Sequence, residues 1–543
     1  MCGIAVIAAP RAGDAHPCLL SRVAARGPDS TTSAVLAPGL VLTASVLSLR
    51  APFTAQPLHD EDSGVVMAFN GELYDGALLS YRDSEVCDSA ALAAAVFDAL
   101  SVANPPTPAA AAAALRHALA AAVDVGEWAL VVWLPALSTL LWARDRFGRR
   151  SLLEARSGDG ELAAVASVAC LCEPDPSSPA LDWSPVFPAG VYGASWDPDA
   201  GRLSEPVLAE FHPVPGLPAM ELLDLLPPPA AAAAEPDCEP VVVAASDLLP
   251  AVESLGALLT EAVARRVVNV RDAASVGILF SGGLDSMVVA ALAHAVLPPH
   301  TAIELINVAF AKDAAPEDAF NTPDRMTGTA SAAHLVEHYA PDRTWIWVPV
   351  NVRAADLTAA TPAIAETVAP AATAMDLSIG AALYFASSLE RRADATAPLA
   401  PARVLLTGLG ADELLGGYTR HRARWTRGGW SALSAELALD FARLWRRNLG
   451  RDDRVVAAHG CELRLPFLDE DVVAFLTSLP LAWRTDPSRE RGVGDKHLLR
   501  ALAAQLELGA AAAAPKRAIQ FGSRIAKVLP KCDGTTALGA LGL

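Results

Sequence analysis

Short apolar stretches recur through the second half of the chain, separated by longer stretches of helical character. They cover residues 276–280, 303–310, 345–350 and 403–408, and residues 255–270 form an amphipathic helical pattern ahead of the first. Apolar runs of this length, without polar alternation, are typical of strands buried on both faces of a parallel sheet. Strands that alternate with helices predict an α/β domain, whose ligands bind at the carboxyl ends of the strands.

The first apolar stretch runs directly into a glycine turn, and an alanine-rich helix follows. The turn consists of Ser281, Gly282, Gly283, Leu284, Asp285 and Ser286. Backbone N–H groups at such a turn and the helix dipole favour an anion, and the two serine hydroxyls add donors. Asp285 would repel a bare phosphate, so it indicates a bridging cation such as Mg²⁺. Gly-Gly alone is equally consistent with a tight turn capped by serine, and the P-loop sequence G-x-x-x-x-G-K-[ST] does not occur in the chain.

The whole S-G-G-L-D-S stretch resembles the pyrophosphate loop of the ATP pyrophosphatases, which join AMP to a carboxylate or similar group and release pyrophosphate. The stretch at 403–408 leads into a second glycine-rich segment that contains Leu409, Asp412 and Glu413. In a parallel sheet, Asp412 would lie at the same edge as Asp285. Two acids at one edge suit a Mg²⁺–pyrophosphate complex.

The N-terminal half opens with Met1-Cys2-Gly3 and an apolar run over residues 4–7. Removal of Met1 is expected because cysteine is small, and it would leave Cys2 with an α-amine whose pKa is about 7.7–8.0. That amine can take the thiol proton, so the nucleophile would carry its own base. A chance cysteine at the second position is the alternative.

A further predicted strand, residues 65–69, ends at Asn70-Gly71. An asparagine amide and a glycine N–H are suitable oxyanion-hole donors, although Asn-Gly is also typical of a hairpin turn. Together with Cys2, these residues resemble a class II glutamine amidotransferase domain, an N-terminal-nucleophile hydrolase with an αββα sandwich. The resemblance implies that Cys2 attacks the glutamine amide. It places Asn70 and Gly71 in the oxyanion hole, and Glu72 and Asp88 around the glutamine α-amine.

One position departs from the amidotransferase pattern. The family's arginine, which grips the glutamine carboxylate, would fall near Ser45 in this chain. Arg50 is the nearest arginine. It either replaces the family's arginine from a shifted position or is an ordinary surface charge.

The C-terminal half carries three motifs in the order found in the asparagine synthetase domain. They are S-G-G-L-D-S, then G-x-G-A-D-E-x-x-x-G-Y, then R-x-D with G-x-E-x-R-x-P-F-L-D. The forms T-G-L-G-A-D-E and N-L-G-R-D-D-R, with the tail at 515–524, are similar to the divergent asparagine synthetase domain-containing branch. Leu409 stands where the family has a glutamate, so acid–base help worth about 10²–10⁴-fold would be missing. Ala518 stands where the family has a lysine.

This resemblance implies a set of residues around ATP and Mg²⁺. Residues 281–286 would bind the phosphates, with Leu279 and Val308 beside the adenine, Thr407 and Gly408 near the nucleotide, Lys516 or Arg517 reaching the phosphates, and Asp285 and Asp412 holding Mg²⁺.

Composition sets the domain boundaries and excludes some partners. The 543 residues carry a net charge of −19, which argues against nucleic acid as a partner. No stretch predicts a membrane span, no signal peptide precedes Cys2, and eight scattered cysteines indicate reduced thiols, so a cytoplasmic protein is expected. Proline and alanine gather at residues 213–244, which predicts a linker between a domain at 2–212 and one at 245–543. Residues 104–115 share this bias and are predicted to form a loop.

The two family resemblances together imply a glutamine-dependent asparagine synthetase-like ligase with glutamine, aspartate and ATP as substrates. Aspartate would be activated as β-aspartyl-AMP with release of pyrophosphate, and ammonia from glutamine would displace AMP to give asparagine. Because ammonia must be kept from water, a closed channel between the domains is expected. Leu409, Ala518 and Arg50 keep two alternatives open: a nucleotide-binding or regulatory protein with weak or lost synthesis, and amidation of another carboxylate. A homodimer also stays open.

Overall fold

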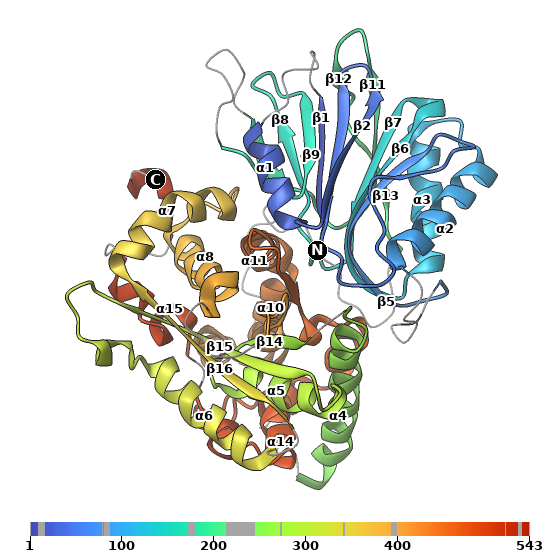
Figure 1. The fold of residues 1–543 in the computed structure, drawn as a ribbon. Coiled ribbons are helices and arrows are strands. Elements are labelled where there is room, and N and C mark those ends of the chain that lie inside the picture. The colour runs from blue at the N-terminus through green and yellow to red at the C-terminus, as the bar shows by residue number, and fades with distance from the viewer. Residues whose placement is uncertain are drawn as a thin grey trace.

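The chain forms two domains that lie against each other, the N-terminal one in blue to teal and the C-terminal one in green to red (Figure 1). The computed structural model describes residues 2–8, 17–78, 80, 87–171, 181–212, 245–271, 274–339, 343–392, 399–515, 517–529 and 535–541. The predicted linker at 213–244 lies outside the described residues, so its boundaries stay a prediction.

Two antiparallel sheets make up the N-terminal domain. One contains β1 (Gly3–Ala8), β2 (Ser30–Ala37), β3 (Leu40–Val46), β8 (Leu153–Arg156), β9 (Leu162–Ala166), β10 (Asp182–Pro185) and β12 (Arg202–Leu203). The other contains β4 (Leu58–His59), β5 (Val66–Asp75), β6 (Val125–Leu134), β7 (Thr139–Arg144), β11 (Gly190–Asp197) and β13 (Val207–Glu210). Pairing of β11 with β12 joins the two sheets along one side.

The two sheets pack face to face, and helices cover both outer faces. Ile4 of β1 and Val131 of β6 share the core between the sheets. Helix α1 (Pro17–Arg26) packs on the first sheet, and α2 (Asp88–Ala103) and α3 (Pro108–Ala122) pack on the second (Figure 1). This arrangement confirms the predicted αββα sandwich.

Helix α3 corrects the prediction of a loop at residues 104–115. Pro108 occupies its first turn, and Thr107 caps it by accepting a hydrogen bond from the Ala110 N–H. Alanine is the strongest helix former, and proline is tolerated at the first helical position, so the biased composition builds a helix here. Ala111 and Leu115 are fully buried, which makes this stretch part of the core.

The C-terminal domain is built on a five-stranded parallel sheet, as the apolar stretches predict. Its order is β16 (Trp345–Arg353), β15 (Ala302–Ala311), β14 (Ser275–Leu279), β17 (Val404–Leu406) and β18 (Glu462–Arg464). One face is covered by α4 (Ala245–Val267), α5 (Leu284–Val296), α12 (Glu470–Ser478) and α14 (His497–Gln505). The other is covered by α7 (Ala354–Val368), α8 (Ala374–Ser387) and α11 (Gly450–Ala457).

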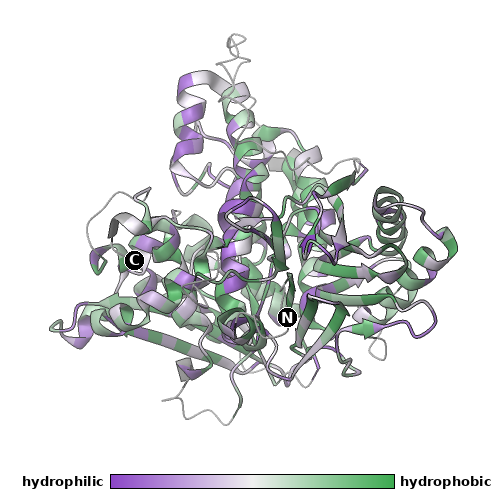
Figure 2. Cartoon of the chain, turned by 90° about the horizontal axis from the view of Figure 1, so that it is seen from above, coloured by the Kyte–Doolittle hydropathy of each residue, from purple (hydrophilic) through white to green (hydrophobic). Residues whose placement is uncertain are grey.

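The remaining helices in the described part of this domain are α6 (Pro323–Tyr339), α9 (Ala411–Leu415), α10 (Thr419–Ala442), α13 (Leu481–Arg484) and α15 (Ile519–Gly522). Leu335 of α6 and Leu414 of α9 join the core on the first face. The strands of both domains are largely hydrophobic, whereas hydrophilic residues gather along some of the helices (Figure 2). Within the described ranges, every helix is too short or too polar to cross a bilayer.

Candidate functional site

Cys2 lies directly ahead of β1 and is held by three other segments. Its N–H donates to Asn70 Oδ1 at 2.9 Å, and Arg26 Nε donates to its carbonyl oxygen at 3.2 Å. Gln56 Nε2 lies 3.7 Å from its Sγ. The side chain is buried, with 7% exposed, so the backbone and thiol of Cys2 have a defined position.

Asn70 and Gly71 lie inside β5, so the hairpin-turn alternative is wrong. They pair with Ala129 and Trp128 of β6. A Cβ on Gly71 would overlap the Glu127 carbonyl oxygen, which explains why glycine stands at this point of close approach. The Asn70 Nδ2 atom is buried beside Cys2 and has no hydrogen-bond acceptor in the described structure. A buried donor without an acceptor is uncommon, and this one suits an oxyanion that forms only during reaction.

The electrostatics of this pocket require a base for the thiol. Burial raises the pKa of the Cys2 thiol to about 11, so the thiol is protonated at neutral pH. Burial also raises the pKa of Glu72 to about 7; the Asp88 carboxylate acts in the same direction and Arg464 opposes it. Asp88 accepts hydrogen bonds from the Leu73 N–H at 2.9 Å and the Ser89 N–H at 2.8 Å.

Arg50 is a buried residue, so the surface-charge alternative is wrong. It is 5% exposed, and its NH1 donates to the Leu73 carbonyl oxygen at 2.9 Å. The same nitrogen lies 3.9 Å from Glu72 Oε2. Ser45, at the position expected for the family's arginine, accepts a hydrogen bond from the Gly3 N–H at 3.0 Å. The structure therefore brings Arg50 to the predicted amine-binding acids, and its role toward glutamine stays a prediction.

The glycine turn at residues 281–286 has the predicted strand–glycine–helix form. Strand β14 ends at Leu279 and helix α5 begins at Leu284. Gly282 has φ 76°, and a Cβ there would overlap the backbone of Gly328 in α6. Ser286 Oγ donates to the Gly283 carbonyl oxygen at 3.0 Å, which keeps the turn closed.

Residues from the neighbouring strands reach the same edge. Val308 lies in β15 beside β14, and Thr407 and Gly408 follow β17. A Cβ on Gly408 would contact the Asp285 side chain, so the two loops are in close approach. These residues surround the expected nucleotide position, although their contacts to ATP stay predictions.

Lys496 is the residue that the sequence reasoning missed. Its Nζ lies 2.7 and 2.6 Å from the two carboxylate oxygens of Asp285 and 2.7 Å from Asp412 Oδ1. It directly precedes α14 and is 1% exposed. The available signal was a lysine at a helix start in G-D-K-H-L-L-R, whereas the family resemblance points to the lysine-bearing tail.

The family's lysine and glutamate, replaced in this chain by Ala518 and Leu409, have no substitute from the tail among the residues that the structure describes. Lys516 lies outside the described residues, and Arg517 NH1 is 3.6 Å from Asp324 Oδ1. Ala518 is exposed ahead of α15. Leu409 packs against the hydrophobic core, so it offers an apolar surface where a carboxylate was expected.

Asp285 and Asp412 meet at the sheet edge as predicted, with the Lys496 ammonium between them. The described residues contain no cluster of three or more histidine, cysteine or acidic side chains that could hold a metal unaided. Mg²⁺ commonly uses one or two carboxylates together with substrate phosphates and water. The two acids therefore fit Mg²⁺ that arrives with a nucleotide, provided that Lys496 turns toward the phosphates.

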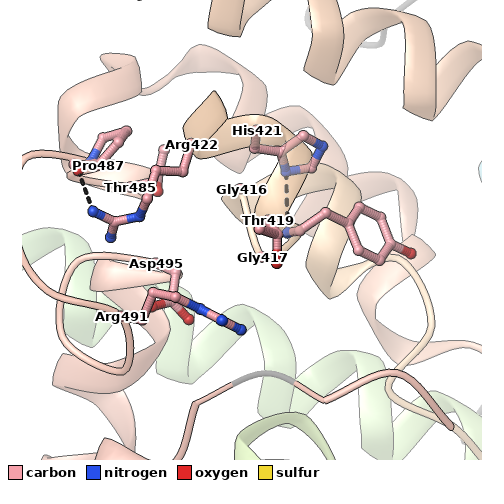
Figure 3. Close-up of a pocket in the computed structure, with 10 residues that line it drawn as sticks. Gly416, Gly417, Thr419, His421, Arg422, Thr485, Pro487, Arg491 and Asp495 are labelled. Atoms are coloured by element: carbon pink, nitrogen blue, oxygen red, sulfur yellow. Dashed lines mark hydrogen bonds between the residues drawn. The ribbon is translucent and has the colours of Figure 1, made fainter. Parts of the chain in front are cut away.

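A small recess lies between Gly417, Arg422 and Asp495 (Figure 3). Gly417 and Asp495 line it, and a Cβ on Gly417 would overlap the side chains of Asp412 and Lys496. Arg422 also lines the recess, and its NH1 donates to the Pro487 carbonyl oxygen at 2.6 Å. The absence of a side chain at Gly417 thus leaves the space that Lys496 and Asp412 occupy.

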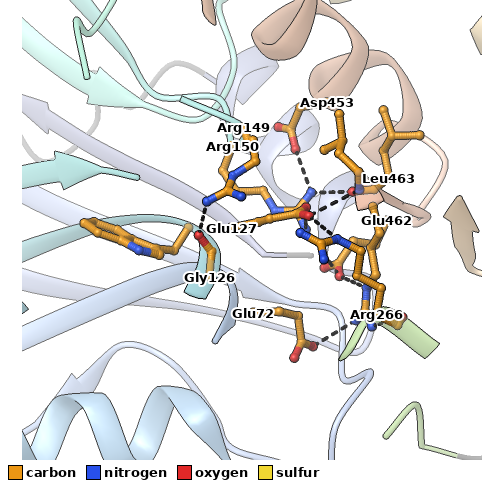
Figure 4. Close-up of polar contacts among 12 residues, drawn as sticks. Glu72, Gly126, Glu127, Arg149, Arg150, Arg266, Asp453, Glu462 and Leu463 are labelled. Atoms are coloured by element: carbon orange, nitrogen blue, oxygen red, sulfur yellow. Dashed lines mark hydrogen bonds and ion pairs between the residues drawn. The ribbon is translucent and has the colours of Figure 1, made fainter. Parts of the chain in front are cut away.

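A network of buried charged residues joins the two domains (Figure 4). Glu127 of β6 lies 3.1 Å from Arg150 and 2.8 Å from Arg266 of α4. Arg464 of β18 lies 3.1 Å from Glu72 and 2.6 Å from Glu462. Both domains contribute to this network. It connects the Cys2 pocket with the parallel sheet that carries the glycine turn at residues 281–286.

Comparisons with known proteins match both halves of the chain. Residues 254–431 and 426–524 match the asparagine synthase model, and residues 47–172 match a glutamine amidotransferase domain. Asparagine synthetase domain-containing protein 1 of Mus musculus is 32% identical, with 94% of each chain covered. A relative in Saccharomyces cerevisiae, also an asparagine synthetase domain-containing protein, is 30% identical over 94% of this chain and 88% of its own.

Solved structures give a weaker match. Glutamine phosphoribosylpyrophosphate amidotransferase from B. subtilis is 14% identical, with a TM-score of 0.28, and the match covers 55% of this chain and 64% of that one. The two domain matches and the nearly full-length relatives identify the lineage. The chain belongs to the asparagine synthase family, in the branch of the asparagine synthetase domain-containing proteins.

Proposed function

We propose that this protein is a glutamine-dependent ligase that uses ATP to convert a carboxylate, with aspartate as the first candidate, into an amide. The supporting observation is the buried Asn70 Nδ2, which has no acceptor in the described structure and lies in the residue that binds the Cys2 N–H. A donor in that position is suited to an oxyanion formed at the Cys2 thiol.

The glutaminase half would work through the Cys2 thiol. After loss of Met1, the α-amine of Cys2 takes the thiol proton while Sγ attacks the glutamine side-chain carbonyl carbon. Asn70 Nδ2 and the Gly71 N–H donate hydrogen bonds to the resulting oxyanion. The α-ammonium group of Cys2 then gives its proton to the amide nitrogen, and the C–N bond of the tetrahedral intermediate breaks to release ammonia. Water then hydrolyses the thioester to glutamate. One oxyanion donor contributes about 10²–10³-fold to kcat in comparable enzymes.

Binding of glutamine in this proposal uses charges of both signs. Glu72 and Asp88 hold the α-ammonium group, and Arg50 holds the α-carboxylate. All three side chains are buried, with 8%, 5% and 5% exposed respectively, so their charges act in a medium that screens them weakly.

The ligase half would bind ATP on the turn at 281–286. The acceptor carboxylate attacks the α-phosphorus, pyrophosphate leaves, and ammonia then displaces AMP from the acyl adenylate. Lys496 contacts the departing phosphates in this scheme, and Asp285 and Asp412 would hold the metal. Mg²⁺, when bound, neutralises phosphate charge. Leu279 and Val308 flank the adenine, and Thr407 and Gly408 line the nucleotide.

A second candidate function rests on Leu409. This side chain packs on the core, so the acceptor pocket lacks the family's glutamate. A protein with this pocket could bind ATP with slow synthesis, or could amidate a carboxylate other than aspartate. Ala518, exposed and without a charge, favours the same alternatives.

The test measures pyrophosphate, glutamate and asparagine in one reaction with ATP, Mg²⁺, aspartate and glutamine. Cys2→Ala should abolish glutamate formation but keep pyrophosphate release with ammonium chloride. Asp285→Ala should abolish pyrophosphate release but keep glutamate formation. Binding of ATP without aspartate-dependent pyrophosphate release would support another acceptor or a nucleotide-binding role. Absence of both activities from the intact protein would refute the ligase proposal.

A further inference from the structure

The carbonyl group of Cys2 is tied to the C-terminal domain through one arginine. Arg26, the last residue of α1, is fully buried and donates from Nε to the Cys2 carbonyl oxygen at 3.2 Å. Its NH2 donates to Asp453 Oδ2 at 2.9 Å. Asp453 lies in α11 of the C-terminal domain and is 1% exposed. The other domain therefore fixes the guanidinium that holds the nucleophile's backbone.

Glu72 has a similar contact with the C-terminal domain. Arg464 of β18 places its NH2 3.1 Å from Glu72 Oε1. The guanidinium is fixed on its own side by hydrogen bonds to Glu462 Oε1 and to the Arg266 carbonyl oxygen, both 2.6 Å. The Arg464 carbonyl oxygen accepts a hydrogen bond from the Thr407 N–H at 3.2 Å, at the start of the nucleotide loop.

We infer that the glutaminase site is completed by the C-terminal domain, in which Asp453 positions the nucleophile and Arg464 positions the carboxylate that receives the glutamine α-ammonium. This inference rests on the proposed glutaminase function of Cys2. It goes further, because it makes glutamine hydrolysis depend on the docked arrangement of α11 and β18.

The effect of Asp453 follows from the burial of Arg26. Without the Asp453 charge, the Arg26 guanidinium would remain buried near the like charge of Arg454, and it would turn toward other acceptors. The Cys2 carbonyl oxygen would then lose its donor. A misplacement of about 1 Å at a nucleophile can cost 10²-fold in rate, whereas substrate binding at Glu72 is unaffected.

The effect of Arg464 is on binding. Burial and Asp88 raise the pKa of Glu72, and Arg464 lowers it. Glu462 and Arg50 also face Glu72, and they act in opposite directions. Loss of the Arg464 charge would raise the pKa of Glu72 further and leave it protonated near neutral pH. A neutral carboxyl group binds an ammonium ion poorly, so the KM for glutamine should rise while kcat changes little.

The experiment compares two variants of the full-length chain, Asp453→Asn and Arg464→Gln, by glutamate formation from glutamine at several pH values. Asp453→Asn should lower kcat about 10–10²-fold with KM within about twofold. Arg464→Gln should raise KM about tenfold and move the pH at which KM begins to rise to a higher value. ATP binding, measured by calorimetry, should be retained in both and reports an intact C-terminal domain.

Glu470→Gln is the matched control. It also removes one charge from an ion pair between the domains, with Arg149, but it contacts neither Cys2 nor Glu72. Its kcat and KM should stay within about twofold of the unmodified chain. If Asp453→Asn does not fold, the double variant Arg26→Leu with Asp453→Leu replaces the pair by apolar side chains, and it should show the same loss of kcat.

Unchanged kcat and KM in both variants would overturn the inference. Equal losses of glutaminase activity in Asp453→Asn, Arg464→Gln and Glu470→Gln would also overturn it, because they would show a merely structural role. Failure of the proposed function has a different signature: the unmodified protein would form no glutamate, or Cys2→Ala would form as much as the unmodified protein.

Discussion

Lys496 joins two carboxylates that follow separate strands of the parallel sheet, Asp285 in the first turn of α5 and Asp412 in the first turn of α9. Its single positive charge offsets part of the negative charge of Asp285 and Asp412, and it would be free to contact phosphates once Mg²⁺ is held by the two acids. We predict that Lys496→Met lowers pyrophosphate release at least about 10²-fold and leaves glutaminase activity unchanged. Because the two acids would then lack the positive charge of Lys496, Mg²⁺ alone should raise the melting temperature of the variant more than that of the unmodified protein. Thermal melting with and without Mg²⁺ measures this, and equal shifts would contradict the metal assignment.

The ionisation of Glu72 should make glutamine binding depend on pH, with weaker binding at lower pH. Its pKa is raised to about 7 by burial and by Asp88, and Arg464 limits the rise. The carboxylate must be ionised to hold an ammonium group, so binding weakens as pH falls through that value. We predict a KM for glutamine about tenfold higher at pH 6 than at pH 8, because the ionised fraction falls from about nine-tenths to one-tenth. A KM that stays constant over this range would remove Glu72 from the binding site.

At the scale of elements, strand β5 depends on a glycine at its closest approach to β6. A Cβ on Gly71 would overlap the Glu127 carbonyl oxygen, so Gly71→Ala must push the strands apart. We predict a loss of stability of about 1–3 kcal/mol and a loss of glutaminase activity, since the neighbouring Asn70 would move with the strand. Chemical denaturation and glutamate formation measure both effects. Gly158→Ala is the control, because a Cβ at Gly158 has no neighbour within 4 Å; similar losses there would point to a general glycine effect.

The elements that the sequence predicts are those whose signal is local. The apolar stretches gave four strands of the parallel sheet, and the glycine turn gave the start of α5. Strand β18 was missed because Glu462 and Arg464 are charged, and only their partners across the molecule make them buried. Lys496 was missed for the same reason, since its two acids lie far away in sequence. Long-range charge pairing therefore sets the limit of what the sequence pattern could show.

At the scale of the whole molecule, the two domains share one continuous core. Leu47, Leu49 and Phe147 of the N-terminal domain belong to the buried cluster that surrounds α4 and α5. The Phe147 ring meets the Phe441 ring edge to face, with centroids 5.6 Å apart. Unfolding of one domain alone would expose this apolar surface on the other, so separate melting is unfavourable.

We therefore predict a single cooperative unfolding transition in calorimetry, with equal van't Hoff and calorimetric enthalpies. Phe147→Ala should lower stability by about 3–5 kcal/mol, because it opens a cavity in the shared core. Two resolved transitions in the unmodified protein would contradict the shared core. Val35→Ala is the control, since that side chain is 76% exposed and its loss should shift the melting temperature little. A single transition would also give the glutaminase inference its physical basis, because α11 and β18 would then stay docked on the Cys2 site for as long as the protein is folded.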